Sequence, residues 1–84
     1  MIIIYSTPHC VYCDKVKDLF DKHKIKYTVV NVAESDETVE NFREKTGQMG
    51  VPVTEINGKL IIGYKESELL MSIKELKREG DYQI

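Results

Sequence analysis

Residues 1–20 read MIIIYSTPHCVYCDKVKDLF, and they predict a strand that is followed closely by a helix. The first six residues are mostly apolar and β-branched without alternation, as in a strand that is covered on both faces. Pro8 ends this strand, because proline restricts the residue before it to extended geometry. From Val11 the apolar residues recur at helical spacing between charged ones, so a helix is expected to about Lys24.

The remaining elements follow from similar local patterns. Further strands are expected over residues 27–32, 53–56 and 59–62, and further helices over about 36–46 and 65–79. Ser35 or Asp36 is the expected N-cap of the second helix, and Gly80 is the expected stop of the third. The Asn57-Gly58 pair between two apolar runs predicts a hairpin.

The predicted order is β-α-β-α-β-β-α within a single domain over residues 1–84, since a chain this short rarely holds two cores. A right-handed crossover makes the first two strands parallel neighbours, and the hairpin adds antiparallel strands. We therefore expect an α/β fold with a four-stranded mixed sheet flanked by three helices. Residues 10–13 then lie just beyond the carboxyl end of the first strand, where open α/β sheets tend to place their sites.

Composition and charge exclude several classes of function. Hydrophobic residues make up 42% of the chain and charged residues 31%, which is ordinary for a globular protein. A net charge of -2 gives no electrostatic reason to bind nucleic acid or an anionic membrane. No apolar run approaches the roughly 18 residues of a membrane span, and the opening MIIIY is too short for a signal peptide. A cytoplasmic protein is expected.

Cys10 and Cys13 are the only cysteines, and such a pair serves as a staple, as half of a metal site or as a redox couple. As a staple, the disulfide would close a four-residue loop and stabilise the fold by about 2 kcal/mol at best. A zinc site needs four ligands, and only His9 and His23 could supplement the pair, with His23 a helix length away. A redox couple without metal is favoured, and a two-cysteine metal carrier stays open as an alternative.

The start of a helix suits a reactive thiol, because unpaired N–H groups and about half a positive charge stabilise a thiolate there. The pKa of Cys10 is therefore expected to fall from about 8.5 toward 7. Cys13 lies one turn further on, where β-carbons are roughly 5–6 Å apart, and a disulfide needs about 3.8 Å. Closure thus takes a local adjustment, and Cys13, the less exposed sulfur, would resolve a mixed disulfide formed at Cys10.

These residues resemble the glutaredoxin family, which has the thioredoxin fold, and in particular its bacterial and clostridial glutaredoxin-like members. The matching motifs are TPHCVYC at residues 7–13, GVPV at residues 50–53 and IGY at residues 62–64, and the resemblance covers essentially the whole chain. It implies a thiol–disulfide oxidoreductase in which Cys10 attacks and Cys13 resolves. It also implies a cis Val51-Pro52 peptide that faces the disulfide, with the backbone of Val51 pairing with an extended substrate.

Four further positions are expected to contact the substrate. Tyr12 and Tyr64 lie in the motifs beside the cysteine pair and are expected to form an apolar rim for a partner disulfide. Thr7 stands where glutaredoxins often have a lysine that contacts a glutathione carboxylate. Gly63 begins a run that commonly reads Gly-Gly and then an acidic pair, and Val11 stands where proline is usual.

The resemblance implies no tightly bound cofactor and leaves two reductants open. One is glutathione, acting as a co-substrate. The other is a thioredoxin-reductase-type flavoprotein, because a valine after the first cysteine and a Gly-aromatic-basic run also occur in redoxins that thioredoxin reductase recharges and that serve ribonucleotide reductase. The expected partners are disulfide-containing proteins, among them ribonucleotide reductase or a peroxidase, and the expected state is a monomer.

Overall fold

The order of helices and strands is the one that the sequence predicts. The structure, a computed structural model, describes residues 2–48 and 50–79; the expected stop at Gly80 lies outside them. The elements are β1 (Ile2–Ser6), α1 (Val11–Lys22), β2 (Thr28–Asn31), α2 (Asp36–Thr46), β3 (Val53–Ile56), β4 (Lys59–Ile62) and α3 (Glu66–Glu79). In this part of the chain no helix is long and apolar enough to cross a membrane.

The strands form one mixed sheet in the order β2-β1-β3-β4. β1 pairs with β2 in parallel and with β3 in antiparallel fashion, and β3 pairs with β4 through the hairpin. The hairpin turn lies at Asn57-Gly58, where both residues have positive φ, 48° and 90°, as the favoured two-residue hairpin turns require. The predicted parallel pair and the predicted antiparallel hairpin are both confirmed.

Two elements are slightly shorter than predicted. α1 stops at Lys22 instead of Lys24, because Lys24 adopts a left-handed φ of 59° and turns the chain toward β2. β2 is one residue shorter at each end than residues 27–32. Val32 nevertheless still donates its backbone N–H to the carbonyl of Ser6 at 2.9 Å, so the contact with β1 continues past the strand.

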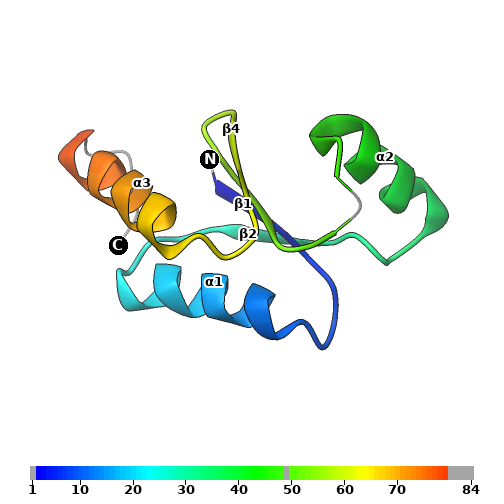
Figure 1. Cartoon of the computed structure of the whole chain (residues 1–84), viewed down its shortest axis with the longest axis horizontal. Coiled ribbons are helices and arrows are strands. Elements are labelled where there is room, and N and C mark those ends of the chain that lie inside the picture. The colour runs from blue at the N-terminus through cyan, green and yellow to red at the C-terminus, as the bar shows by residue number, and fades with distance from the viewer. Residues whose placement is uncertain (1, 49, 80–84) are drawn as a thin grey trace.

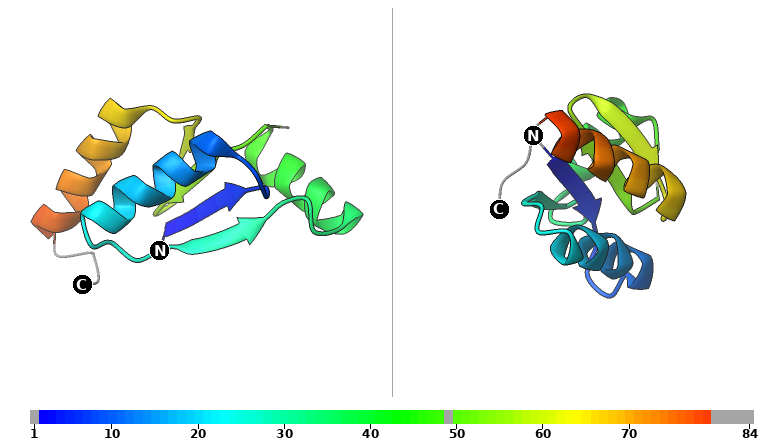
Figure 2. Two further views of the ribbon diagram at one scale, coloured as in Figure 1. Left: turned by 90° about the horizontal axis from the view of Figure 1, so that it is seen from below. Right: turned by 90° about the vertical axis from the view of Figure 1, so that its left-hand side faces the viewer.

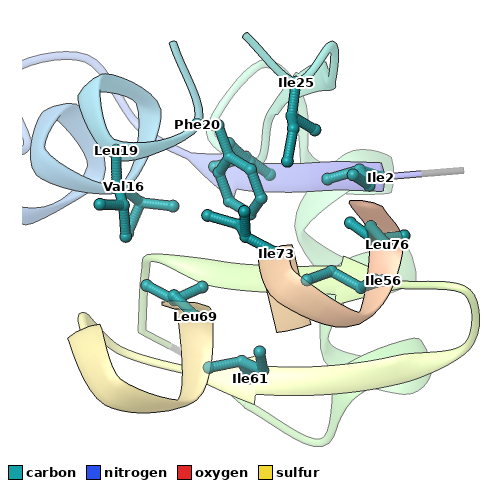
Figure 3. Packing of buried hydrophobic residues seen from close by; sticks show 11 residues of the cluster. Ile2, Val16, Leu19, Phe20, Ile25, Ile56, Ile61, Leu69, Ile73 and Leu76 are labelled. Carbon is teal, nitrogen blue, oxygen red and sulfur yellow. The ribbon is translucent and has the colours of Figure 1, made fainter. Parts of the chain in front are cut away.

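α1 and α3 cover one face of the sheet (Figures 1 and 2). Alternation along β1 places Ile2 and Ile4 on this face, where they join Ile56 of β3 and Ile61 of β4. Figure 3 shows the apolar side chains of the two helices against those of the strands. The cluster comprises Ile2, Ile4, Val16, Leu19, Phe20, Ile25, Ile56, Ile61, Leu69, Ile73 and Leu76.

α2 covers the opposite face with a smaller cluster, so the prediction of a four-stranded sheet flanked by three helices is confirmed. Phe42 lies against Tyr5, with ring centroids 5.3 Å apart, and both share the cluster with Val53. The Glu55 carboxylate accepts a hydrogen bond from the Tyr5 hydroxyl at 3.2 Å and lies 3.2 Å from Lys45 Nζ. One large apolar side chain and one ion pair thus hold α2 against the sheet.

Candidate active site

The cysteine pair lies at the N-terminus of α1. Cys10 is the N-cap residue, with extended backbone angles of φ −104° and ψ 107°. Its Sγ accepts a hydrogen bond from the backbone N–H of Cys13 at 3.2 Å, so the sulfur satisfies a free amide of the first turn. A disulfide joins the two cysteines, whose α-carbons are 5.2 Å apart. The pair therefore lies where the sequence predicts it.

The two sulfurs differ in exposure. The side chain of Cys13 is fully buried, with 0% of its surface exposed, whereas Cys10 is half-buried. The residues between them, Val11 and Tyr12, are 67% and 58% exposed and form an apolar surface beside the disulfide. A sulfur that approaches from solvent can therefore reach Cys10 but not Cys13.

The loop between β1 and α1 contains two residues that the sequence analysis considered. His9 has a left-handed φ of 61° and is exposed, so its imidazole lies at the surface. Thr7 is half-buried. Among the described residues, no hydrogen bond or ion pair joins the Thr7 side chain to the cysteines. Thr7 is thus close to the cysteines in the sequence, but no described hydrogen bond or ion pair connects its side chain to theirs.

The Val51-Pro52 peptide bond is cis, as the family resemblance implies. It directly precedes β3, whose first residue, Val53, pairs with Tyr5 near the end of β1. Because α1 follows this same end of β1, the cis peptide and the cysteine pair lie at the same end of the two central strands. The Pro52 carbonyl also accepts a hydrogen bond from the N–H of Gly63 at 2.8 Å, which brings the chain after β4 to the same end.

Tyr12 and Tyr64 are brought together by Lys15, a residue that the sequence analysis did not assign to this surface. Lys15 Nζ lies 5.2 Å from the ring centroid of Tyr12 and 5.9 Å from that of Tyr64. Gly63 leads into this arrangement with a φ of 81°, which favours glycine although open space surrounds a Cβ there. Burial, and then the Glu66 carboxylate, raise the pKa of the Tyr64 hydroxyl.

Metal ligands do not cluster in the described part of the chain. There, no three histidine, cysteine, aspartate or glutamate side chains lie together in a group that could hold a metal ion. His23 caps the C-terminal end of α1, at the opposite end of the helix from Cys10. It is therefore not placed to complete a site with the cysteine pair.

Most of the chain matches a known protein family, since the model of the family Glutaredoxin covers residues 2–61. The chain belongs to the glutaredoxin family. It is 41% identical over 69 residues to an uncharacterized glutaredoxin-like protein in the rubredoxin operon of Clostridium pasteurianum. The aligned residues cover 82% of this chain and 92% of that relative. It is 32% identical over 69 residues to the glutaredoxin-like protein NrdH of Lactococcus lactis, covering 82% and 94% of the two chains.

A solved member of this family has the same fold. The buckwheat glutaredoxin–glutathione complex is 29% identical and superposes with a TM-score of 0.65 over 94% of this glutaredoxin and 69% of that chain. The expected thioredoxin-like fold is confirmed. Glutaredoxins are thiol–disulfide oxidoreductases, and the family uses glutathione as a substrate. With a disulfide at the start of α1 as its two-electron couple, this chain is a thiol–disulfide oxidoreductase.

Proposed function

We propose that Cys10 is the attacking cysteine and Cys13 the resolving cysteine of this oxidoreductase. The observation that carries the proposal is the difference between the two sulfurs. Cys10 Sγ is accessible and faces an amide of the first turn, whereas Cys13 is sealed from solvent. Disulfide exchange begins with a thiolate, so the sulfur that is both reachable and stabilised as an anion attacks first.

In the reductive direction, the Cys10 thiolate attacks one sulfur of the substrate disulfide. A bond forms between Cys10 and the substrate, the substrate S–S bond breaks, and the leaving thiolate takes up a proton. Cys13 then loses its proton and attacks the Sγ of Cys10, which releases the second substrate sulfur as a thiol and closes the protein disulfide. Two electrons pass from the protein to the substrate, and a reductant must return them.

We assign substrate binding to the residues around the pair: Thr7, Tyr12, Val51, Gly63 and Tyr64 at the surface, and the buried Pro52 through the cis peptide that it forms with Val51. The backbone of Val51, beside the cis peptide, is proposed to pair with an extended segment of the substrate. The exposed apolar surface of Tyr12 and its neighbour Val11 supports a docking role, because such patches mark interaction sites. The hydrogen bond between Gly63 and Pro52 supports the grouping of these residues at one end of the sheet.

The proposed substrates are protein disulfides and glutathione mixed disulfides, with glutathione as the reductant. Family membership supports this proposal, as does the glutathione complex of the buckwheat relative. The proposed setting is the cytoplasm, where dithiols are kept reduced, and the proposed state is a monomer that carries electrons between the reductant and its targets.

A redoxin that a thioredoxin-reductase-type flavoprotein recharges is the second candidate, with ribonucleotide reductase or a peroxidase as its target. The relative named NrdH supports it. Thr7 and Lys65 also support it, because glutathione-dependent members often have a lysine at the position of Thr7 and an acidic residue at the position of Lys65. These two residues bear on the choice of reductant and leave the exchange chemistry at Cys10 unchanged.

Coupled turnover of a small disulfide tests both candidates. The protein is supplied with bis(2-hydroxyethyl) disulfide and NADPH, together with either glutathione and glutathione reductase or thioredoxin reductase alone. Turnover in the first system supports a glutaredoxin, and turnover in the second alone supports the redoxin. If dithiothreitol reduces the Cys10–Cys13 disulfide but neither system gives turnover, an electron-carrier role is contradicted.

Metal analysis tests the remaining alternative, a metal-carrying binding module. The protein is purified under reducing conditions, so that both thiols are free to bind a metal. Stoichiometric zinc, copper or iron in this preparation would favour the carrier over the oxidoreductase as the working role of the pair.

A further inference from the structure

Lys15 connects two parts of the active-site surface that are far apart in the sequence. Its Nζ lies 5.2 Å from the ring centroid of Tyr12, in the first turn of α1, and 5.9 Å from that of Tyr64, between β4 and α3. Both distances fall in the range over which the face of an aromatic ring attracts a cation. The ammonium group is therefore held between the two tyrosines.

The carboxylates of this region of the chain interact with groups other than Lys15: Glu66 with the Tyr64 hydroxyl, and Asp14 and Glu68 with other lysines. Asp14, its neighbour on α1, lies 3.8 Å from Lys17 Nζ, and Glu68 of α3 lies 3.7 Å from Lys65 Nζ. Within the part of the chain that the structure describes, no carboxylate forms an ion pair with Lys15 itself. Its three N–H donors are thus available to a group that arrives from outside.

The position of Lys15 relates it directly to the disulfide. Tyr12 lies between the two cysteines, so one ring that holds the ammonium group borders the reactive pair. Tyr64 follows Gly63, whose N–H is bonded to the Pro52 carbonyl, so the other ring borders the cis peptide. A substrate that covers both rings on its way to Cys10 therefore comes within reach of the Lys15 ammonium group.

We infer that Lys15 is a specificity-determining residue, which favours disulfides that carry a carboxylate beside the sulfur to be attacked. The inference rests on the proposed function, because it takes Cys10 as the point of entry. The partner is defined by its chemistry, as an acidic peptide or protein segment around a disulfide. A free carboxylate on that segment would meet the Lys15 ammonium group while its apolar atoms cover Tyr12 and Tyr64.

Two physical effects make such a contact selective. Docking excludes water from the rim, and a charge pair is stronger when its surroundings are less polar than water. The two rings also restrict the lysine side chain before the partner arrives, so less conformational freedom is lost on binding. A basic segment at the same place would set like charges together, which penalises the wrong partner.

The test uses three cysteine peptides of the same length, each as a mixed disulfide with 2-mercaptoethanol. The residues that flank the cysteine are glutamate in the first, glutamine in the second and lysine in the third. The second-order rate constant for reduction by the pre-reduced protein is measured without any reductase, so the identity of the physiological reductant does not matter. Lys15→Met removes the charge and keeps an unbranched side chain, whereas Lys15→Arg keeps the charge.

Lys22→Met is the matched control, because it makes the same change in net charge at the other end of α1. The preference for the glutamate peptide over the glutamine peptide is expected to fall about three- to five-fold in Lys15→Met, the scale of an exposed ion pair. Lys15→Arg should keep the preference and Lys22→Met should leave it unchanged. Added salt should reduce the preference of the unmodified protein, since the charges are screened.

The outcomes separate this inference from the proposed function. If the glutamine peptide is reduced but the ratio of rate constants is the same in Lys15→Met and the unmodified protein, the inference is wrong and the proposed chemistry stands. An equal fall in Lys15→Met and Lys22→Met would also overturn it, because net charge alone would then account for the effect. If no peptide is reduced by the reduced protein, the proposed function itself fails.

Discussion

The reactivity of Cys10 as a function of pH tests how the start of α1 acts on the attacking thiol. In the variant Cys13→Ser, Cys10 is the only cysteine. The hydrogen-bond donor to its Sγ, 3.2 Å away, is the backbone N–H of residue 13, so the substitution does not remove it. The variant therefore isolates one thiol in the environment that the structure describes.

The size of the expected effect follows from the placement of the sulfur at the N-cap. A helix N-terminus stabilises a negative charge by roughly 0.3–2 kcal/mol, and 1.36 kcal/mol corresponds to about one pKa unit. Starting from about 8.5, the pKa of the Cys10 thiol is expected between about 7.0 and 8.3. At pH 7 the thiolate fraction would rise from about 3% to between about 5% and 50%.

The assay measures the rate of alkylation by iodoacetamide between pH 5 and pH 10, at low and at high salt. The same variant unfolded in guanidinium provides the free-cysteine reference under the same chemistry. The folded protein should titrate at lower pH than the unfolded one. Coincident titration curves would refute the claim that the helix terminus activates Cys10.

Three further experiments address the site and the fold. Cys10→Ser should abolish dithiol turnover, and Cys13→Ser should accumulate a mixed disulfide with a small disulfide substrate, seen as added mass; the absence of any adduct would count against Cys10 as nucleophile. Phe42→Ala should lower the free energy of unfolding by about 3–5 kcal/mol in urea denaturation, because Phe42 is the large buried side chain of α2. Val39→Ala, at a half-buried position of the same helix, should cost less, and equal losses would contradict this account of α2. Burial, and then the hydrogen bond to Asp21, raise the pKa of Tyr27 to about 12 from 10.0 in the unfolded chain. Because the pKa is higher in the folded state, the Tyr27 hydroxyl stabilises the fold below pH 10, and this stabilisation is lost as the pH rises toward 12. The free energy of unfolding should therefore fall over this range, and it should fall less in Tyr27→Phe. Equal falls would rule out Tyr27 as the source.

Local chemistry explains why most of the fold could be predicted from the sequence. Ser35 caps α2 by accepting the N–H of Thr38 at 3.1 Å, and Gly47 ends it with a left-handed φ of 70°. The Asn57-Gly58 turn likewise depends on the two residues that adopt positive φ. Each of these features depends on residues close together in the chain, so a short stretch of sequence carries the information.

Contacts between distant residues were harder to predict. The spacing of Tyr12 and Lys15 on one helix suggests their contact, but nothing local indicates that Tyr64 completes it. The burial of Thr54 was also hard to predict, since a threonine in a short strand is usually expected to lie near solvent. It lies instead in β3, in the interior of the sheet, fully buried and with no hydrogen-bond partner for Oγ1 among the described residues.

The short span of the cysteine pair predicts that it can change oxidation state without disturbing the fold. The disulfide closes one turn at the start of α1, and neither apolar cluster contains Cys10 or Cys13. Opening it should therefore lower the free energy of unfolding by at most about 2 kcal/mol, the entropic contribution of so small a loop. Urea denaturation of the oxidised protein and of the protein kept in dithiothreitol measures this difference, with Cys10→Ser as a control that should not respond to dithiothreitol. Loss of cooperative unfolding on reduction would show that the pair holds the fold together, and a reversible electron carrier cannot depend on a bond that it must break in each cycle.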